Sequence, residues 1–480
     1  MIALAVALPL LGAFLLPLMG PLKRVFGPAV LLAVAALALS VWPQAQAEPF
    51  AVAIGEFRAP LGIVFYVDGV AALFTLAVAL VCLLLWPWST PTEDATAKQS
   101  LTLILAGACA GLAVSGDLFN IYVFYELVAV ASYGLAAGSG SAAGYAAAFR
   151  YLVLSSLASM LALIGITLIY YRTGTVNLAH LAQVAPDALH DPLGLAAFLL
   201  LLLGLGVKAE LFPVNAWVPE VYATAERRVA ALLAGLVSKL ALLVLVRLLV
   251  LVFPLDPARF ALLALGTLGI LSGELAAYRA RDLARMLSWS SIGQLGIAFV
   301  AFAIPGKAGV VAGLAVALHH LIAKPALFLL AERWGGSIEG LAGAGRRSKL
   351  GGALFVLFAL SLVGVPPLPG FWAKLLVLSG LAAQEGGAWW LAAAVILAMT
   401  VVEATYLFRV VGRLYAPDTD DESQPHGAAY LAAAGILGLC LIAGSVSAGP
   451  LGHALGRMAA QVGDRDAYIA RVLPAGETRP

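Results

Sequence analysis

Long apolar runs separated by short polar segments make up most of this 480-residue chain. Because a bilayer core of about 30 Å requires about 20 apolar residues per helix, each run predicts one membrane-spanning helix. About fourteen such helices are predicted, near residues 2–19, 28–45, 66–88, 100–115, 117–138, 142–171, 192–212, 229–252, 260–278, 286–304, 308–332, 352–385, 387–408 and 427–448. The pattern therefore predicts an all-α polytopic membrane protein.

Basic residues in the connecting loops predict how the helices are oriented. Counted from the N-terminus, the odd-numbered loops hold fourteen Arg and Lys residues and the even-numbered loops hold four. Since cytoplasmic loops carry the excess of positive charge, the odd loops are expected in the cytoplasm and both termini outside. We predict a multi-pass protein of the cell (inner or plasma) membrane.

Three longer polar segments are expected outside the membrane. Residues 47–65 alternate loosely between apolar and polar positions and favour a short hairpin on the outer face. Residues 173–190 resemble a polar outer loop. Residues 416–426 are acidic and are expected to form a solvated cytoplasmic linker.

Composition agrees with a membrane protein and narrows the class of function. Hydrophobic residues make up 62% of the chain and charged residues 11%, whereas soluble domains carry roughly 25% charged residues. The apolar excess is expected to face the lipid bilayer. The net charge of +2 is spread over many short loops, so no nucleic-acid partner is expected.

The sequence indicates no metal, no cofactor and no catalytic residues. Cys82, Cys109 and Cys440 lie far apart inside apolar runs, a spacing that suits neither zinc nor an iron–sulfur cluster. We expect them to be packing residues. The apolar stretch 1–19 is followed, not preceded, by basic residues, which favours a retained first helix over a cleaved signal.

Ionisable residues occur inside the predicted helices or their breaks. A charge at the centre of the membrane costs at least about 2.5–3.5 kcal/mol on insertion scales. Such residues are expected to face the bundle interior, to pair with one another or to line water. They are Arg150, Lys208, Lys239, Arg247, Lys324, Lys374, Asp68, Glu126, Glu210, Glu274 and Glu403.

Two predicted helices are interrupted by proline at membrane depth. The seventh contains Pro213 and Pro219, and the twelfth contains three prolines within 366–369. Paired interrupted helices are typical of transporters built from inverted repeats, with the ion path at the breaks. Each predicted half carries a lysine beside its break, Lys208 or Lys374.

We divide the chain into three N-terminal helices with the hairpin (1–99), two inverted five-helix repeats (100–252 and 253–415), and the linker, last helix and tail (416–480).

The chemistry of these residues suits proton transfer. A carboxylate close to a buried lysine stabilises the protonated amine, and burial without it favours the neutral amine. A change in the Glu126–Lys208 distance would therefore switch Lys208 between holding and releasing a proton. A potential of 100 mV supplies about 2.3 kcal/mol per charge, so modest rearrangements would move protons.

Six motifs in order resemble the antiporter-like subunits shared by Mrp-type cation/proton antiporters, membrane-bound hydrogenases and respiratory complex I. The resemblance covers roughly residues 65–415 and is closest to the D-type subunits of Mrp antiporters. The motifs are DLFNIYVFYE with the following Ser132-Tyr133, GVKAELFPVNAWVPEVY, SKLALLVLVR, RDLARMLSWSSIGQLG, HHLIAKPALFLL and GVPPLPGFWAK. A Glu at position 210 and Ala225-Glu226-Arg227-Arg228 depart from the family pattern.

The resemblance implies roles for individual residues. Glu126 and Lys208 would form the ion pair of the first half, and Lys239 the central relay. His320, on the same helical face as Lys324, would connect Lys239 towards Lys374. The predicted proton-translocation residues are Glu126, Lys208, Lys239, His320, Lys324, Lys374 and Glu403.

Structural alternatives stay open for several polar residues. Asp68 and Glu274 are interpreted as structural or entry-path groups, and Arg247 as a side chain that snorkels to the interface. His319 and His320 must face different directions. Three serines close together are expected to hydrogen-bond helix to helix, namely Ser288, Ser290 and Ser291.

The resemblance implies a proton-translocating subunit of a multi-subunit cation (Na⁺)/proton antiporter. The alternative is a proton-pumping subunit of a complex I-like NADH:quinone oxidoreductase or a membrane-bound hydrogenase. A non-transporting scaffold would be expected to lose the intramembrane charges that this chain keeps. The expected partners are other membrane subunits, protons, sodium and the lipid bilayer.

Overall fold

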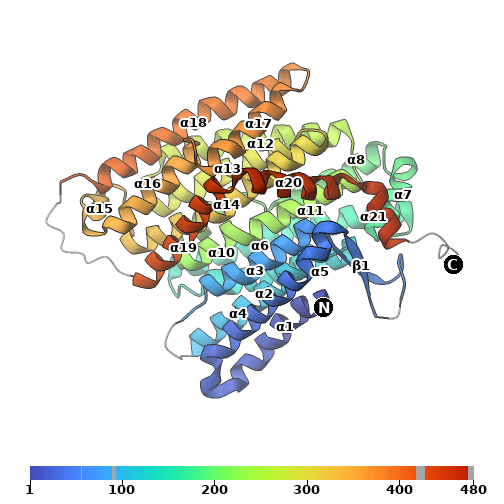
Figure 1. Ribbon diagram of the computed structural model, residues 1–480, viewed down its shortest axis with the longest axis horizontal. Coiled ribbons are helices and arrows are strands. Elements are labelled where there is room, and N and C mark those ends of the chain that lie inside the picture. The colour runs from blue at the N-terminus through green and yellow to red at the C-terminus, as the bar shows by residue number, and fades with distance from the viewer. Residues whose placement is uncertain (56, 89–92, 418–426, 474–480) are drawn as a thin grey trace. The chain divides into compact units, whose positions relative to one another are not determined.

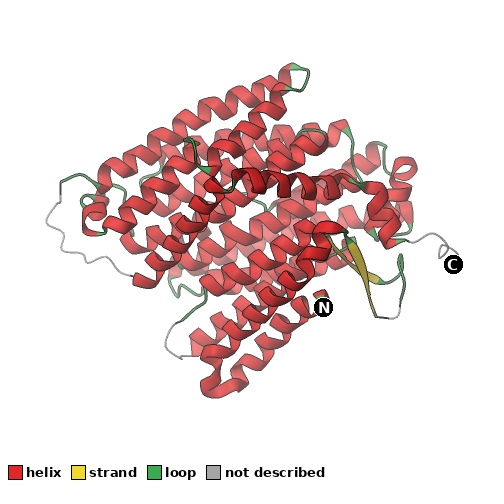
Figure 2. Cartoon of the chain, viewed as in Figure 1, coloured by secondary structure: helices red, strands yellow, loops and turns green. Residues whose placement is uncertain are grey.

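Helices dominate the computed structural model, which describes residues 1–55, 57–88, 93–417 and 427–473 (Figure 2). The chain divides into two compact units. The first comprises Met1–Ala209, Leu236–Ala261 and Gly456–Pro480, and the second Glu210–Gly235 and Leu262–Leu455. Residues 210–235 thus pack with the second unit, although they precede residue 252, where the first predicted repeat ends. The inverted repeats themselves stay a prediction.

Most of the helices are labelled in Figure 1. The first unit contains α1 (Ile2–Leu15), η1 (Leu16–Leu22), α2 (Lys23–Ala47), α3 (Gly69–Leu84), α4 (Glu93–Val114), α5 (Leu118–Ala137), α6 (Ala142–Thr173), α7 (Leu178–Ala188), α8 (Pro192–Gly206), α11 (Ser238–Leu251) and α21 (Arg465–Val472). The second contains α9 (Val218–Thr224), α10 (Arg227–Leu232), α13 (Leu283–Ala303), α14 (Gly306–Trp334), η3 (Glu339–Leu341), α15 (Ala344–Arg347), α16 (Lys349–Val363), α17 (Pro369–Ala382), α18 (Gly387–Leu414) and α19 (Ala428–Val446). Helices η2 (Leu233–Val237), α12 (Asp256–Arg279) and α20 (Ala448–Gly463) have residues in both units.

The protein is a helical membrane protein, and each predicted run falls on one or more helices. Among the described residues, ten helical segments are long and apolar enough to span a membrane. The helices α3, α8, α16 and α17 are apolar but shorter. The predicted count of fourteen spans is therefore not confirmed. One reason is that the twelfth predicted run, 352–385, consists of two shorter helices, α16 and α17.

Both expected helix breaks are present. Helix α8 ends at Gly206, and the next helix begins at Val218. Helix α16 ends at Val363, and α17 begins at Pro369. Gly364 closes α16 with φ +92°, a conformation that glycine adopts without steric cost.

The predicted hairpin at 47–65 is confirmed in the described residues. Strands β1 (Phe50–Ile54) and β2 (Ile63–Val67) pair antiparallel, with Phe50 opposite Val67. Asp68 follows directly and accepts a hydrogen bond from the backbone N–H of Ala71 at 2.7 Å, which caps α3. The hairpin therefore leads straight into the apolar helix α3.

Other segments differ from the prediction. The loop expected at 173–190 contains α7, which Asn177 caps by accepting from the N–H groups of Ala179 and His180. The C-terminal tail contains α20 and α21. Most of the acidic linker, residues 418–426, lies outside the described residues. Short amphipathic helices such as α7 lack the 20-residue apolar run on which the prediction relied.

In the second unit, α12 and α13 pack with their backbones in close approach. A Cβ added to Gly296 would lie 2.7 Å from the Gly266 carbonyl oxygen, and one added to Gly273 would lie 2.5 Å from the Gly293 nitrogen. Small residues permit this approach between membrane helices. The glycines thus fix the distance between α12 and α13.

We predict that Gly296→Ala destabilises the protein, because the new methyl group meets backbone atoms that cannot move independently. Overpacking of this kind costs about 1–3 kcal/mol. Gly412→Ala on α18 is the matched control, since a Cβ there meets no atom within 4 Å. The thermal unfolding midpoint in detergent should fall for Gly296→Ala and stay unchanged or rise for Gly412→Ala. Equal midpoints would contradict the close-packing interpretation.

Candidate functional site

In the first unit, α6 presents two serines that bind the two charged groups predicted as an ion pair. The Lys208 Nζ donates to Ser155 Oγ at 2.9 Å, and Ser159 Oγ donates to the Glu126 carboxylate. Ser155 and Ser159 lie four residues apart and therefore on one face of α6. Among the described residues, Glu126 and Lys208 make no direct ion pair. Hydroxyls, not a salt bridge, hold the two charged groups.

Lys208 follows the end of α8 at Gly206, and its side chain packs on Tyr125, which also binds the last turn of that helix. Helix ends leave carbonyl groups without intrahelical partners, and the Tyr125 hydroxyl donates to the carbonyls of Gly204 and Leu205 at 3.0 and 3.1 Å. The Lys208 Nζ lies 3.7 Å from the centroid of the same Tyr125 ring, which is a cation–π contact. Only 1% of Lys208 is exposed.

Lys239 is fully buried on α11. Its Nζ donates to Ser238 Oγ at 3.1 Å. The π-turn η2 comes directly before Ser238, and such turns inside helices frequently occur at functional sites. The predicted relay lysine therefore lies at an irregular point of its helix.

In the second unit, Lys374 and Glu403 form a direct ion pair between α17 and α18. The Lys374 Nζ lies 2.7 Å from Glu403 Oε2 and donates to Thr400 Oγ1 at 3.2 Å. Gln294 on α13 donates to the other carboxylate oxygen at 2.7 Å. Glu403 and Lys374, both among the predicted proton-translocation residues, are thus in direct contact.

Helix α14 carries three polar side chains that contact serines. Lys324 Nζ donates to Ser290 Oγ at 2.7 Å, and His320 Nε2 lies 3.2 Å from Ser291 Oγ. Both serines belong to α13, so the expected helix-to-helix role is confirmed for Ser290 and Ser291. It is wrong for Ser288, which donates to the Ala284 carbonyl at 2.6 Å within its own helix. A further pair joins His319 Nε2 to Ser361 Oγ of α16 at 2.9 Å.

The two histidines therefore face different helices, as adjacent positions on a helix require. His320 turns to α13 together with Lys324. His319 turns to Ser361 of α16, close to the point where that helix ends at Val363.

Sequence reasoning missed Tyr406. Its hydroxyl donates to Glu274 Oε2 at 2.8 Å, and it lies on α18 three residues after Glu403. Glu274 is 2% exposed, and its Oε1 has no hydrogen-bond partner among the described residues. A tyrosine in an apolar helix gives no sequence signal of its own; only its helical spacing from Glu403 could have indicated it.

The interpretation of Arg247 as a snorkelling side chain is wrong. Its Nη2 lies 3.1 Å from both carboxylate oxygens of Asp68, and 8% of the residue is exposed. Asp68 is thus the buried counter-ion of Arg247. Burial and the Asp68 charge raise the pKa of the neighbouring Tyr66, on β2, well above its usual value. The Tyr66 hydroxyl therefore stays protonated beside the ion pair.

Glu210, which departs from the family pattern, has partners in the second unit. Its side chain accepts from the Tyr222 hydroxyl at 2.8 Å, and Asn215 donates to its carbonyl at 3.3 Å. The residue has φ +59°, an uncommon conformation outside glycine. These contacts hold the irregular segment between α8 and α9.

In the first unit, serine hydroxyls thus contact Lys208, Lys239 and Glu126. In the second unit, lysines, histidines and carboxylates contact hydroxyls, and Lys374 also contacts Glu403. Hydroxyls and neutral histidine both donate and accept hydrogen bonds, which is the property that a proton relay requires. This fold and site define a polytopic membrane protein with ionisable side chains held inside its helical units.

Comparison with known proteins identifies the family. A model described as "NADH:quinone oxidoreductase/Mrp antiporter, TM" matches residues 115–401. The chain belongs to this family of antiporter-like membrane subunits. The N-type subunit of the NADH-quinone oxidoreductase of Desulforudis audaxviator is 31% identical over 386 residues, covering 77% of this chain and 76% of the relative.

A second relative has a different assignment. The D-type subunit of the Na⁺/H⁺ antiporter of Alkalihalophilus pseudofirmus is 29% identical over 440 residues, covering 88% of this chain and 87% of the relative. Among solved structures, a chain of the archaeal membrane-bound sulfane sulfur reductase superposes with a TM-score of 0.91 at 31% identity, covering 98% of this chain and 99% of the other. The relatives therefore belong to more than one kind of complex.

We predict strong energetic coupling between Lys374 and Glu403. Glu403→Gln leaves a buried lysine without its counter-ion, which costs about 3–5 kcal/mol. Adding Lys374→Met removes that charge and should restore much of the stability. A double-mutant cycle on the thermal unfolding midpoint measures the coupling.

The control cycle uses the ion pair of Arg172 with Asp191, 2.9 Å apart and with side chains 30% and 39% exposed. Arg172→Met and Asp191→Asn should show much weaker coupling, because water screens exposed charges. Coupling of equal size in the two cycles would count against a buried, desolvated Lys374–Glu403 pair.

Proposed function

We propose that the chain is the proton-translocating subunit of a multi-subunit cation (Na⁺)/proton antiporter. The observation that supports this most directly is a buried lysine at each helix break, with a carboxylate nearby: Lys208 with Glu126, and Lys374 with Glu403. The resemblance to a D-type antiporter subunit over 88% of the chain supports the antiporter.

Protons would move between the proton-translocation residues that the sequence predicts. Lys208 exchanges its proton with the Ser155 hydroxyl, and Glu126 is held ready by Ser159. Lys324 and His320 exchange with serines of α13. The proposed translocation residues are Glu126, Lys208, Lys239, His320, Lys324, Lys374 and Glu403.

The proposed membrane is the cell membrane, with both termini outside. The excess of basic residues in the odd-numbered loops supports this orientation. Other membrane subunits would share the complex and supply or receive the exchanged ions.

A redox-driven complex is the second candidate. It is favoured by the 31% identity to an NADH-quinone oxidoreductase subunit and by the TM-score of 0.91 to a respiratory complex chain. In that case the driving energy would come from neighbouring subunits. Inverted vesicles distinguish the two: sodium added without an electron donor should dissipate a preformed pH gradient only for the antiporter.

We predict that Glu126→Ala and Lys208→Ala each abolish proton transport while the complex still assembles. Each change removes one of the two groups that exchange the proton in the first unit. Fluorescence quenching of a pH dye in inverted vesicles measures transport, and co-purification measures assembly. The matched controls Glu385→Ala and Lys307→Ala change residues outside the proposed path and should transport normally. Normal transport in both site variants would sink the mechanism.

We predict that Ser155 and Ser159 position the exchanging groups. Loss of a hydrogen bond to a charged group costs about 1.5–3 kcal/mol, so Ser155→Ala and Ser159→Ala should slow transport roughly tenfold or more. The pH profile should also shift, because the charged partner loses its hydroxyl.

The control is Ser156→Ala on the same helix, which should leave both the rate and the pH profile unchanged. Ser155→Thr keeps the hydroxyl and should restore transport. If Ser155→Ala and Ser156→Ala had the same profile, the hydroxyls would have no positioning role.

A further inference from the structure

A basic pocket lies in the second unit where α12 ends and α13 begins, beside the end of α9. Its volume is about 670 Å³. Apart from alanines, its lining residues are Thr224, Arg279, Arg281, Asp282, Arg285 and Trp289. None of them belongs to the proton-exchanging groups, so the pocket is separate from the proposed function.

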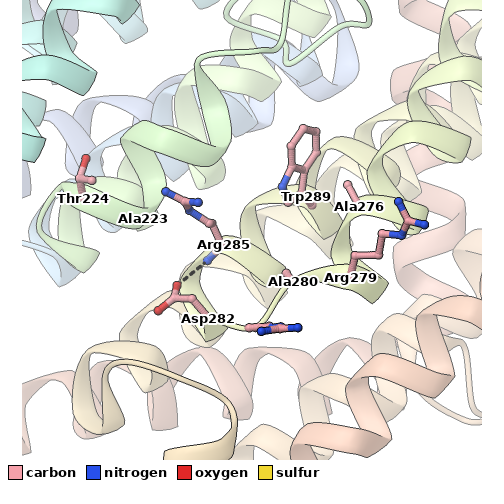
Figure 3. A pocket seen from close by; sticks show the side chains of 9 residues that line it. Ala223, Thr224, Ala276, Arg279, Ala280, Asp282, Arg285 and Trp289 are labelled. Atoms are coloured by element: carbon pink, nitrogen blue, oxygen red, sulfur yellow. Dashed lines mark hydrogen bonds between the residues drawn. The ribbon is translucent and has the colours of Figure 1, made fainter.

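The pocket has an excess of positive charge. Three arginines face one carboxylate, and Asp282 already caps α13 by accepting from the Arg285 backbone N–H at 2.9 Å (Figure 3). In the part of the chain that the structure describes, no guanidinium of the three donates to a protein acceptor. Figure 3 shows the guanidinium groups of Arg279 and Arg285 on either side of the Trp289 indole. The pocket is thus built to receive an anion.

The planar guanidinium group matches phosphate oxygens with two parallel hydrogen bonds. Two such groups flanking a cavity of this size favour a phosphate-bearing ligand. A free phosphate and a phospholipid headgroup share this chemistry.

The surface next to the pocket favours the lipid. Leu268, Leu275 and Tyr278 on α12 are 44%, 49% and 48% exposed. Their spacing of seven and three residues places them on one face of the helix, and this face leads to Arg279 at the end of the span. Acyl chains can lie along this face while the headgroup enters the pocket, and tyrosine and tryptophan are typical of the membrane interface.

We propose that this basic pocket binds the phosphate headgroup of an anionic phospholipid, held by Arg279 and Arg285 with its acyl chains along α12. Basic pockets between membrane helices bind such headgroups in other proteins. By the charge of the loops, the pocket lies on the side that we propose as cytoplasmic.

Titration of the purified, delipidated complex with phosphatidylglycerol, followed by native mass spectrometry, tests the proposal. The double variant Arg279→Gln/Arg285→Gln should weaken binding roughly 30-fold, as expected for two arginines near a membrane surface. The control Lys349→Gln/Arg413→Gln removes the same charge from exposed positions elsewhere in this unit and should bind as the unchanged protein does. Phosphatidylcholine should not compete in any of the three proteins.

Three outcomes would overturn the proposal. Equal binding by the pocket and control variants would show that the arginines do not select the lipid. Displacement of phosphatidylglycerol by millimolar inorganic phosphate would identify a free-anion site. Loss of a partner subunit from the pocket variant, with lipid binding unchanged, would assign the pocket to an acidic segment of that partner. The lysine variant Arg279→Lys/Arg285→Lys, which keeps the charge, should bind with intermediate affinity if the headgroup is held bidentately.

Discussion

The cost of an ionised side chain in a hydrocarbon environment governs where the polar groups of this protein lie. A buried charge without partners would be lost to neutralisation or would destabilise its helix. The buried lysines therefore donate hydrogen bonds to neighbouring hydroxyls or carboxylates. Lys208 donates to Ser155, Lys239 to Ser238, Lys324 to Ser290 and Lys374 to Glu403. Serine is small enough to serve as a partner without separating the helices, which explains why serines recur beside the charges.

The helix breaks follow from the same constraint. A break frees carbonyl groups, which are tolerated in a membrane only where protein or water satisfies them. Tyr125 donates to the freed carbonyls of the last turn of α8, and Lys374 donates to the Val363 carbonyl at 3.4 Å at the end of α16. In the second unit the lysine and the break thus support each other, because the freed carbonyl accepts a hydrogen bond from the charged group. At the end of α8 a tyrosine hydroxyl has this role.

The sequence predicted the helices and their breaks because 20-residue apolar runs and clustered prolines are local features. It also indicated the charged residues, because each stands out in an apolar run. It could not predict which side chains these charged residues contact. Arg247 binds Asp68, which lies 179 residues away in the sequence, and Tyr406 binds Glu274, 132 residues away. Both contacts depend on packing between segments that are distant in the sequence. For the same reason, Arg247 was misread as a snorkelling side chain.

The two lysines at the breaks have different partners. Lys374 touches a carboxylate at 2.7 Å, whereas Lys208 touches a hydroxyl at 2.9 Å with Glu126 bound separately by Ser159. A contacting carboxylate stabilises a protonated lysine more than a hydroxyl does. The two lysines therefore meet the same cost of burial in different ways. Lys374 has a counter-ion in direct contact, whereas Lys208 is held by a hydroxyl and by the face of the Tyr125 ring.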